Sequence, residues 1–183
     1  LGGSASDDES GVSNIIWSTD KGGSGAVSGA TSWTISEINL SLGDTVIAIT
    51  VTDNAGNTGM ATITVTYGTV PTAITASATE VTLNSVQLNG TVNAGGLPTT
   101  AYFKYGTMSG TYDNASSVQI VTGTIDEEIH VGINGLLQGK TYYYRLVAYN
   151  TAGDKQGDEM TLKTLDTTAP AGTRVIKDGA EYT

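Results

Sequence analysis

Apolar and polar residues alternate in short runs along most of the chain, and this period of two predicts β-strands. In the run TVIAITVTD, Ile47, Ile49 and Val51 would share one face of a strand while Thr50 lies on the other. Turn-forming Gly, Asn and Asp residues separate such runs, and helical spacing is absent. The sequence therefore predicts an all-β protein. The expected core of the first 67 residues contains Trp17, Trp33, Ile47, Ile49 and Ile63.

A second series of alternating runs follows the connector GTVPTA, where Gly68 and Pro71 are expected to separate two strands. It predicts seven short strands, which suits a β-sandwich. We predict one sandwich at residues 1–67, a second at residues 68–165, and a linker with the first strand of a following module at residues 166–183. The seven candidate strands contain Ile74 and Ala76; Val86, Leu88 and Val92; Phe103 and Tyr105; Val118 and Ile120; Ile129, Val131 and Ile133; Tyr144, Leu146 and Ala148; and Met160 and Leu162.

The stretch GLLQGKTYYYRLVAYN, at residues 135–150, predicts a loop that leads into a central strand. Its first tyrosine, Tyr142, can turn back so that its hydroxyl bonds the loop backbone, an arrangement called a tyrosine corner. Alternation then places Tyr144 and Leu146 in the core beside Tyr142, with Phe103 from an earlier strand. We expect these four residues to be structural.

This stretch resembles strand F and its preceding loop in bacterial fibronectin type III modules, although Gln138 stands where the family usually has proline. The run YFKYGT at residues 102–107 is similar to strand C of the same modules. The resemblance covers roughly residues 70–164. It implies a non-catalytic β-sandwich for this part of the chain.

The first segment resembles bacterial immunoglobulin-like repeats of secreted and surface proteins. The resemblance lies in GSASDDESGVSNIIWS at residues 3–18 and VTDNAGNTGMATITVTY at residues 51–67. It implies that this sandwich lacks the leading strand that such repeats have. The end of the chain, APAGTRVIKDGAEYT, resembles such a leading strand. We therefore consider that residues 166–183 add a strand to another copy, with a flexible tail or packing on its own second module as the alternatives.

The chain of 183 residues has a formal net charge of −10, and both predicted sandwiches are acidic. Residues 1–67 hold seven acidic residues and one basic residue, Lys21. Without a cluster of Lys and Arg, binding to nucleic acid or to anionic lipid is not expected. No apolar run approaches the ~20 residues that a spanning helix needs, so membrane insertion is not expected either.

Cysteine is absent, which excludes disulfides and thiolate metal sites. A cysteine-free acidic chain rich in Thr, Ser and Gly fits a bacterial extracellular or cell-surface module, although many cytosolic domains also lack structural cysteines. Core burial and strand pairing must supply the stability.

Two loops at one end of the first sandwich are rich in oxygen donors. Asp7 and Asp8 lie in one loop, and Asp53 and Asn57 lie in another that the fold would bring close. Such oxygens could hold calcium, but the spacing is not that of an EF-hand, and Asp and Asn equally serve tight turns. We favour turns and expect no other cofactor.

Exposed tyrosines raise the possibility of ligand binding. Tyr143 and Tyr149 fall on one face of the predicted strand with Arg145 between them, where they could stack on a polysaccharide or contact a surface protein. His130, the single histidine, has alternation pointing it to solvent and no nucleophile motif beside it. We expect a non-enzymatic spacer or adhesion-type module pair, with a carbohydrate- or protein-binding accessory module as the alternative.

Overall fold

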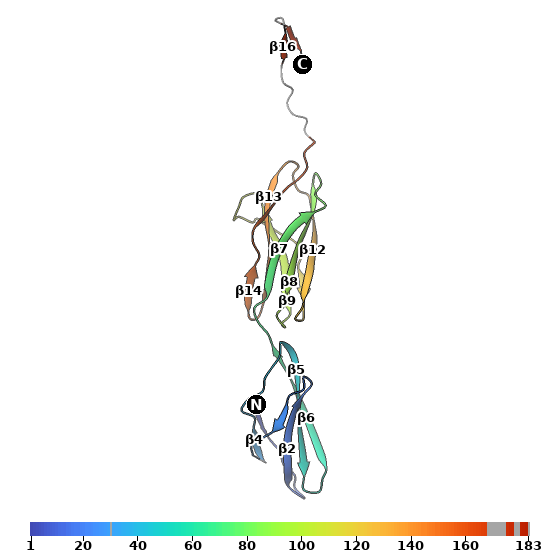
Figure 1. Ribbon diagram of the computed structural model, residues 1–183, viewed down its shortest axis with the longest axis vertical. Coiled ribbons are helices and arrows are strands. Elements are labelled where there is room, and N and C mark those ends of the chain that lie inside the picture. Colours follow the sequence, from blue (N-terminus) through green and yellow to red (C-terminus); the bar gives the residue numbers. More distant parts are fainter. Residues whose placement is uncertain (30, 168–174, 178–179, 183) are drawn as a thin grey trace.

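The computed structural model describes residues 1–29, 31–167, 175–177 and 180–182, and every regular element in these ranges is a β-strand. The fold class is all-β, as the alternation predicts, and the strands form two β-sandwiches. Figure 1 shows the two sandwiches end to end along the long axis of the molecule. Within the described ranges, no helix has the length and apolar character needed to cross a membrane.

The second sandwich contains the strands β7 to β15 and packs a three-stranded sheet on a six-stranded one. The first sheet has the order β12–β8–β7, and the second has the order β10–β9–β13–β14, with β11 also on β9 and β15 also on β13. The bounds are β7 (Thr72–Thr79), β8 (Ser85–Asn93), β9 (Thr99–Gly106), β10 (Asn114–Ala115), β11 (Gln119–Val121), β12 (Asp126–Asn134), β13 (Thr141–Asn150), β14 (Gly153–Gln156) and β15 (Met160–Lys163).

The centre of this sandwich is built on residues that the sequence predicts to face inward. Phe103, Tyr144 and Leu146 are completely buried, and the Phe103 and Tyr144 rings meet at 6.4 Å between centroids. The Tyr144 hydroxyl donates to the Ala76 carbonyl at 2.9 Å and accepts from the Ala78 N–H at 2.8 Å. This side chain therefore joins the two sheets at the irregularity between Ala76 and Thr79 in β7.

The tyrosine corner has the predicted hydrogen bond. The Leu137 N–H donates to the Tyr142 hydroxyl at 3.0 Å, and Tyr142 is only 6% exposed. A hydroxyl with no access to water is thus satisfied by the loop that precedes its own strand. Gln138, in place of the usual proline, does not prevent this geometry.

The first sandwich contains the strands β1 to β6 and packs a two-stranded sheet, β1–β4, on a four-stranded sheet of order β3–β2–β5–β6. Its buried hydrophobic cluster contains Ile15, Trp33, Ile35, Ile47 and Ile49, with Trp17 partly buried against it. The bounds are β1 (Gly2–Ser4), β2 (Val12–Thr19), β3 (Ser24–Ala26), β4 (Ser32–Thr34), β5 (Gly43–Asp53) and β6 (Thr58–Tyr67).

One inward prediction is wrong. Ile63 is 47% exposed because β6 pairs only with β5 in the described part of the chain and nothing there covers it. Ile74 and Ile120 lie in predicted strands, β7 and β11, and are 59% and 63% exposed, since Ala73, Thr75 and Val121 are the buried residues of these strands. Alternation identified the strand β6 but not that its apolar face lacks a cover.

The two sandwiches meet at a glycine. A Cβ built on Gly96 would lie 2.5 Å from the Gly43 nitrogen and 2.9 Å from the Tyr67 carbonyl oxygen, and its φ is +86°. Both the closeness of the neighbouring backbone and the left-handed conformation require glycine here. The connection from Tyr67 to Thr72 is also held, because the Thr69 N–H donates to the Gly95 carbonyl at 2.8 Å.

The end of the chain contains two short strands that pair with each other, β16 (Val175–Lys177) and β17 (Ala180–Tyr182). Most of the predicted linker, residues 168–174, lies outside the described residues. Whether the tail packs on its own chain or on another copy therefore stays a prediction.

Candidate functional site

The outer face of the six-stranded sheet carries the densest group of polar and aromatic side chains in the second sandwich. Tyr112 lies in the loop between β10 and the end of β9, and its ring packs under two cations: Lys104 Nζ lies 4.8 Å from the ring centroid and Arg145 Cζ 5.3 Å. Lys104 on β9 and Arg145 on β13 are directly paired, which places both side chains on one face.

Glu159, the residue before β15, holds the loop that carries Tyr112. Its carboxylate accepts hydrogen bonds from the Ser109 hydroxyl at 2.6 Å, the Gly110 N–H at 2.8 Å and the Tyr112 hydroxyl. The Ser109 hydroxyl, then the Tyr112 hydroxyl and the Gly110 N–H lower the pKa of Glu159 from its usual 4.5 to about 2, because all three donors favour the ionised form. The carboxylate thus anchors the loop that carries Tyr112.

The predicted ligand residues Tyr143, Arg145 and Tyr149 do share this outer face, but they do not form one continuous patch. Tyr149 is 46% exposed, whereas Val147, between it and Arg145, is 5% exposed. Tyr143 and Tyr149 are six residues apart on β13, a span of about 20 Å at the usual rise of a strand. No single small ligand could contact both rings, so only an extended chain or a protein surface matches this spacing.

Sequence reasoning missed Glu159 and Ser109. Glu159 lies just before β15 and Ser109 in the turn after β9, 50 residues apart in sequence. The residues around Glu159, GDEM, carry no motif that marks it as an anchor. Only the pairing of β15 with β13 brings this carboxylate to the loop.

The proposed calcium residues lie at one end of the first sandwich, where two loops meet. Asn54 Nδ2 donates to the Ser10 carbonyl at 2.7 Å and to the Gly11 carbonyl at 3.2 Å, so the loops are in contact as expected. Asp7 Oδ1 accepts from the Ser10 N–H at 2.6 Å and the Gly11 N–H at 2.8 Å. These bonds, with that from the Ser10 hydroxyl, lower the pKa of Asp7.

Asp53 is used in the same way by its own turn. Its two carboxylate oxygens accept from the Asn57 N–H and from Asn57 Nδ2, each at 2.8 Å, and the side-chain bond is the larger reason that the pKa of Asp53 is lowered. Asp8 is exposed. In the described part of the chain, no three His, Cys, Asp or Glu side chains form a group suited to a metal ion. Calcium binding at Asp7, Asp8, Asp53 and Asn57 stays an untested prediction.

His130 is exposed on β12, the orientation that alternation predicts. Its Nδ1 lies 2.8 Å from Asn89 Oδ1 and its Nε2 3.3 Å from Glu128 Oε2. Asn89 is itself held by the β7 backbone, since its Nδ2 donates to the Ser77 carbonyl at 2.8 Å. The imidazole is therefore a surface group that hydrogen-bonds to Asn89 and Glu128.

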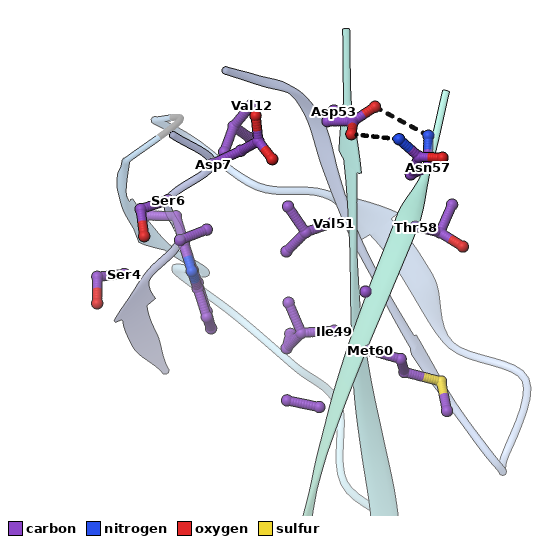
Figure 2. A pocket seen from close by; sticks show the side chains of 14 residues that line it. Ser4, Ser6, Asp7, Val12, Ile49, Val51, Asp53, Asn57, Thr58 and Met60 are labelled. Carbon is purple, nitrogen blue, oxygen red and sulfur yellow. Dashed lines mark hydrogen bonds between the residues drawn. The ribbon is translucent and has the colours of Figure 1, made fainter. Parts of the chain in front are cut away.

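Beside the calcium candidates, a groove opens in the first sandwich. It has a volume of about 470 Å³ and runs between the segment from Ser4 to Asp7 and the strand β6. Figure 2 shows Ile49 and Val51 pointing into this groove from β5, with Ser6 and Asp7 on its far side. Its sides carry both polar and apolar residues, and its floor is formed by the apolar side chains of Ile49, Val51 and Trp33.

Comparison with known proteins finds only distant similarities to solved structures. No protein-family model matches the chain, and no curated protein matches it. Among solved structures, the sensor domain of the anti-sigma factor RsgI4 in Pseudobacteroides cellulosolvens is 20% identical, covering 56% of this chain and 97% of that one, with a TM-score of 0.43.

Two multidomain structures overlap more of the chain. The FN1–FN3 domains of chicken CNTN1 are 13% identical, covering 84% of this chain and 56% of that one, with a TM-score of 0.42. A segment of titin is 16% identical, covering 83% of this chain and 54% of that one, with a TM-score of 0.38. At these values the similarities carry no argument about function.

Proposed function

We propose that this chain is a non-catalytic spacer, a pair of modules that holds its neighbours at a fixed separation in a modular bacterial protein outside the cell. The supporting observation is the junction between the sandwiches. Gly96 approaches the backbone of Gly43 and Tyr67 too closely for any side chain to fit. Two bodies in backbone contact cannot bend freely toward that side.

The connecting segment adds to this restraint. Thr69 is held at both its backbone groups, because its N–H donates to the Gly95 carbonyl and its carbonyl accepts from Asn150 Nδ2 at 2.9 Å. Val70 packs near Gly153, 3.2 Å from a Cβ built there. A connector with its backbone bonded to one module has none of the freedom of a coil. The spacer role needs this stiffness, and no individual residue performs chemistry in it.

The extracellular assignment rests on composition and on the resemblance to bacterial repeats. The chain has no cysteine, a net charge of −10 and many Thr, Ser and Gly residues. A strongly acidic surface resists association with other polyanions and keeps a modular protein soluble. The polar groups that converge around Glu159 and Asp53 already hydrogen-bond to other groups of the chain: Glu159 to the loop that carries Ser109 and Tyr112, and Asp53 to Asn57 of its own turn.

Nuclear relaxation of backbone ¹⁵N nuclei tests the stiffness directly. We expect both sandwiches of the full chain to report one rotational correlation time. In Gly96→Ala the added methyl must push the modules apart, so the two correlation times should separate. Gly135→Ala is the matched control, because Gly135 has a φ of +78° and no heavy atom within 4 Å of a built Cβ. Two independent correlation times in the unaltered chain would refute the spacer proposal.

A second candidate is ligand binding on the outer face of β13. The favouring observation is the exposure of Tyr149 at one end of a strand that carries Tyr143 and Arg145 on the same face. An extended polysaccharide or a partner protein could lie along the strand and contact both tyrosines. A glycan array probed with the full chain, and with Tyr149→Ala as the comparison, decides this. The absence of any bound glycan leaves only the protein-partner form of this candidate.

A further inference from the structure

Part of the inner face of the four-stranded sheet, on strand β6, is uncovered. Ile47 pairs directly with Ile63, and Ile49 with Ala61, so both members of each pair project from the same face of the sheet. On β5, Ile47 and Ile49 are 2% and 6% exposed. On β6, Ile63 is 47% exposed and Ala61 is also exposed. The opposite sheet therefore covers Ile47 and Ile49 on β5 but leaves Ala61 and Ile63 on β6 exposed.

The groove described above reaches this uncovered row at Ala61, two residues before Ile63 on β6. Its apolar floor includes Ile49, Val51 and Trp33, and Ala61 lies on its β6 side. Each wall ends in a strand edge: among the described strands, β1 pairs only with β4 and β6 pairs only with β5. Figure 2 shows the open space between the segment that carries Ser4 and Ser6 and the strands β5 and β6. Unpaired edges beside an apolar floor are the setting in which an added strand binds.

Trp33 gives a second sign that something is missing here. It lines the groove and is 8% exposed, yet its indole Nε1–H has no hydrogen-bond partner among the described residues. A buried N–H without an acceptor is rare, because its lost hydration is not replaced. The Thr45 hydroxyl, which faces the same core from β5, is also buried without a partner. An extended backbone brings carbonyl acceptors, which an apolar cover does not.

We propose that this groove binds the strand β16 of a second copy of the chain. The sequence R-V-I-K at residues 174–177 joins two apolar residues to two bases and contains no acid. The groove ends at Asp7 and Asp53, in a module with seven acidic residues and one basic residue. Three residues of strand span about 10 Å, enough to cover Ala61 and Ile63. Val175 and Ile176 would supply the missing cover.

The arrangement also fits how β16 is placed in its own chain. Its described pairing is with the three residues of β17 alone, and an isolated two-stranded ribbon of this size is marginal in water. Exchange of tails between two copies would close a dimer, whereas one-way addition would form linear chains. Both forms use the same contact, and neither depends on the spacer role.

Cysteine trapping tests the contact, because the natural chain has no cysteine. An Ile63→Cys chain is mixed with an Ile176→Cys chain and oxidised mildly. We expect the mixed disulfide to form at least tenfold faster than when Ile125→Cys replaces Ile63→Cys. Ile125 is the control because it is 71% exposed on the second sandwich, far from the groove. Equal rates would overturn the proposal.

Light scattering of the full chain gives the second measurement. We expect the average mass to rise with concentration, and to return to that of a monomer in Ile63→Lys. Thr62→Lys is the control, because Thr62 pairs with Ala48 and so lies on the opposite face of the same strand. A chain that stays monomeric at every concentration, or that loses association equally in both variants, would refute the strand addition.

Discussion

The two sandwiches show the same alternation of residues but differ in how completely their sheets cover each other. Among the described residues, the core of the second contains seventeen buried hydrophobic side chains, and the core of the first contains five. Alternation decides which face of a strand is apolar. Burial requires in addition that another sheet lies over that face.

The strands of the opposite sheet account for the difference. In the second sandwich, β12, β8 and β7 are eight or nine residues long and cover the facing sheet. In the first, β1 and β4 are three residues each and face strands of eleven and ten residues, β5 and β6. Less apolar area leaves water on folding, so the first sandwich should be the less stable of the two.

The largest expected effect is a loss of stability in the second sandwich that leaves the first sandwich unchanged. Phe103→Ala empties the centre of the second core and should lower its free energy of unfolding by about 3–5 kcal/mol. Both tryptophans, Trp17 and Trp33, lie in the first sandwich. In a denaturant titration, the circular dichroism transition should therefore shift while the tryptophan fluorescence midpoint stays. A common shift of both signals would show that the modules unfold as one unit.

The tyrosine corner gives a smaller effect confined to the second sandwich. Tyr142→Phe leaves the Leu137 N–H without its acceptor and should cost about 1 kcal/mol of stability. The same change at Tyr149, which is 46% exposed, should leave the denaturation midpoint unchanged. If Tyr142→Phe and Tyr149→Phe unfold at the same midpoint, the corner contributes nothing.

Acid should release the Tyr112 loop over a defined range of pH. Glu159 has a folded pKa of about 2, below its usual 4.5, so its contribution is complete above about pH 4.5 and is lost as the pH falls toward 2. The Gly110 amide resonance, whose N–H donates to this carboxylate, should titrate with a midpoint near 2. A midpoint at the usual value would mean that the carboxylate is not anchored. In Glu159→Gln the low-pH step should disappear.

Calcium should have the smallest effect: we expect no measurable change in the midpoint of thermal unfolding. Asp7 and Asp53 already accept hydrogen bonds from their own turns, at Ser10, Gly11 and Asn57. Thermal melts of the full chain in calcium and in chelator should have the same midpoint. A higher midpoint in calcium would establish binding, because a ligand held only by the folded state must stabilise it.

The sequence predicted the positions of the strands well. It predicted less well which strand faces are buried by the opposite sheet. Alternation located β5 and β13, and it placed Ile47, Tyr144 and Leu146 inside correctly. It also predicted the bond from the Leu137 N–H to Tyr142, because both partners lie within six residues of one another. Interactions that are local in sequence leave a local signal.

The polar cluster around Glu159 left no such signal. Its partners Ser109, Gly110 and Tyr112 come from a loop about fifty residues away, and β15 had to pair with β13 before they could meet. The sequence named Arg145 as a ligand residue beside Tyr143, whereas the structure packs its guanidinium over Tyr112. Such contacts depend on which strands pair across the sheet. The sequence of one strand does not reveal which strand will pair with it.

Residue alternation alone was enough to identify an all-β protein, to locate its main strands and to predict that Tyr142 turns back on its loop. Three features follow only from long-range packing: Ile63 on β6 is exposed, the Trp33 N–H has no acceptor among the described residues, and Gly96 lies against the backbone of the other sandwich. The physical reason is that strand periodicity comes from the geometry of the backbone. Burial comes from whatever else packs against it.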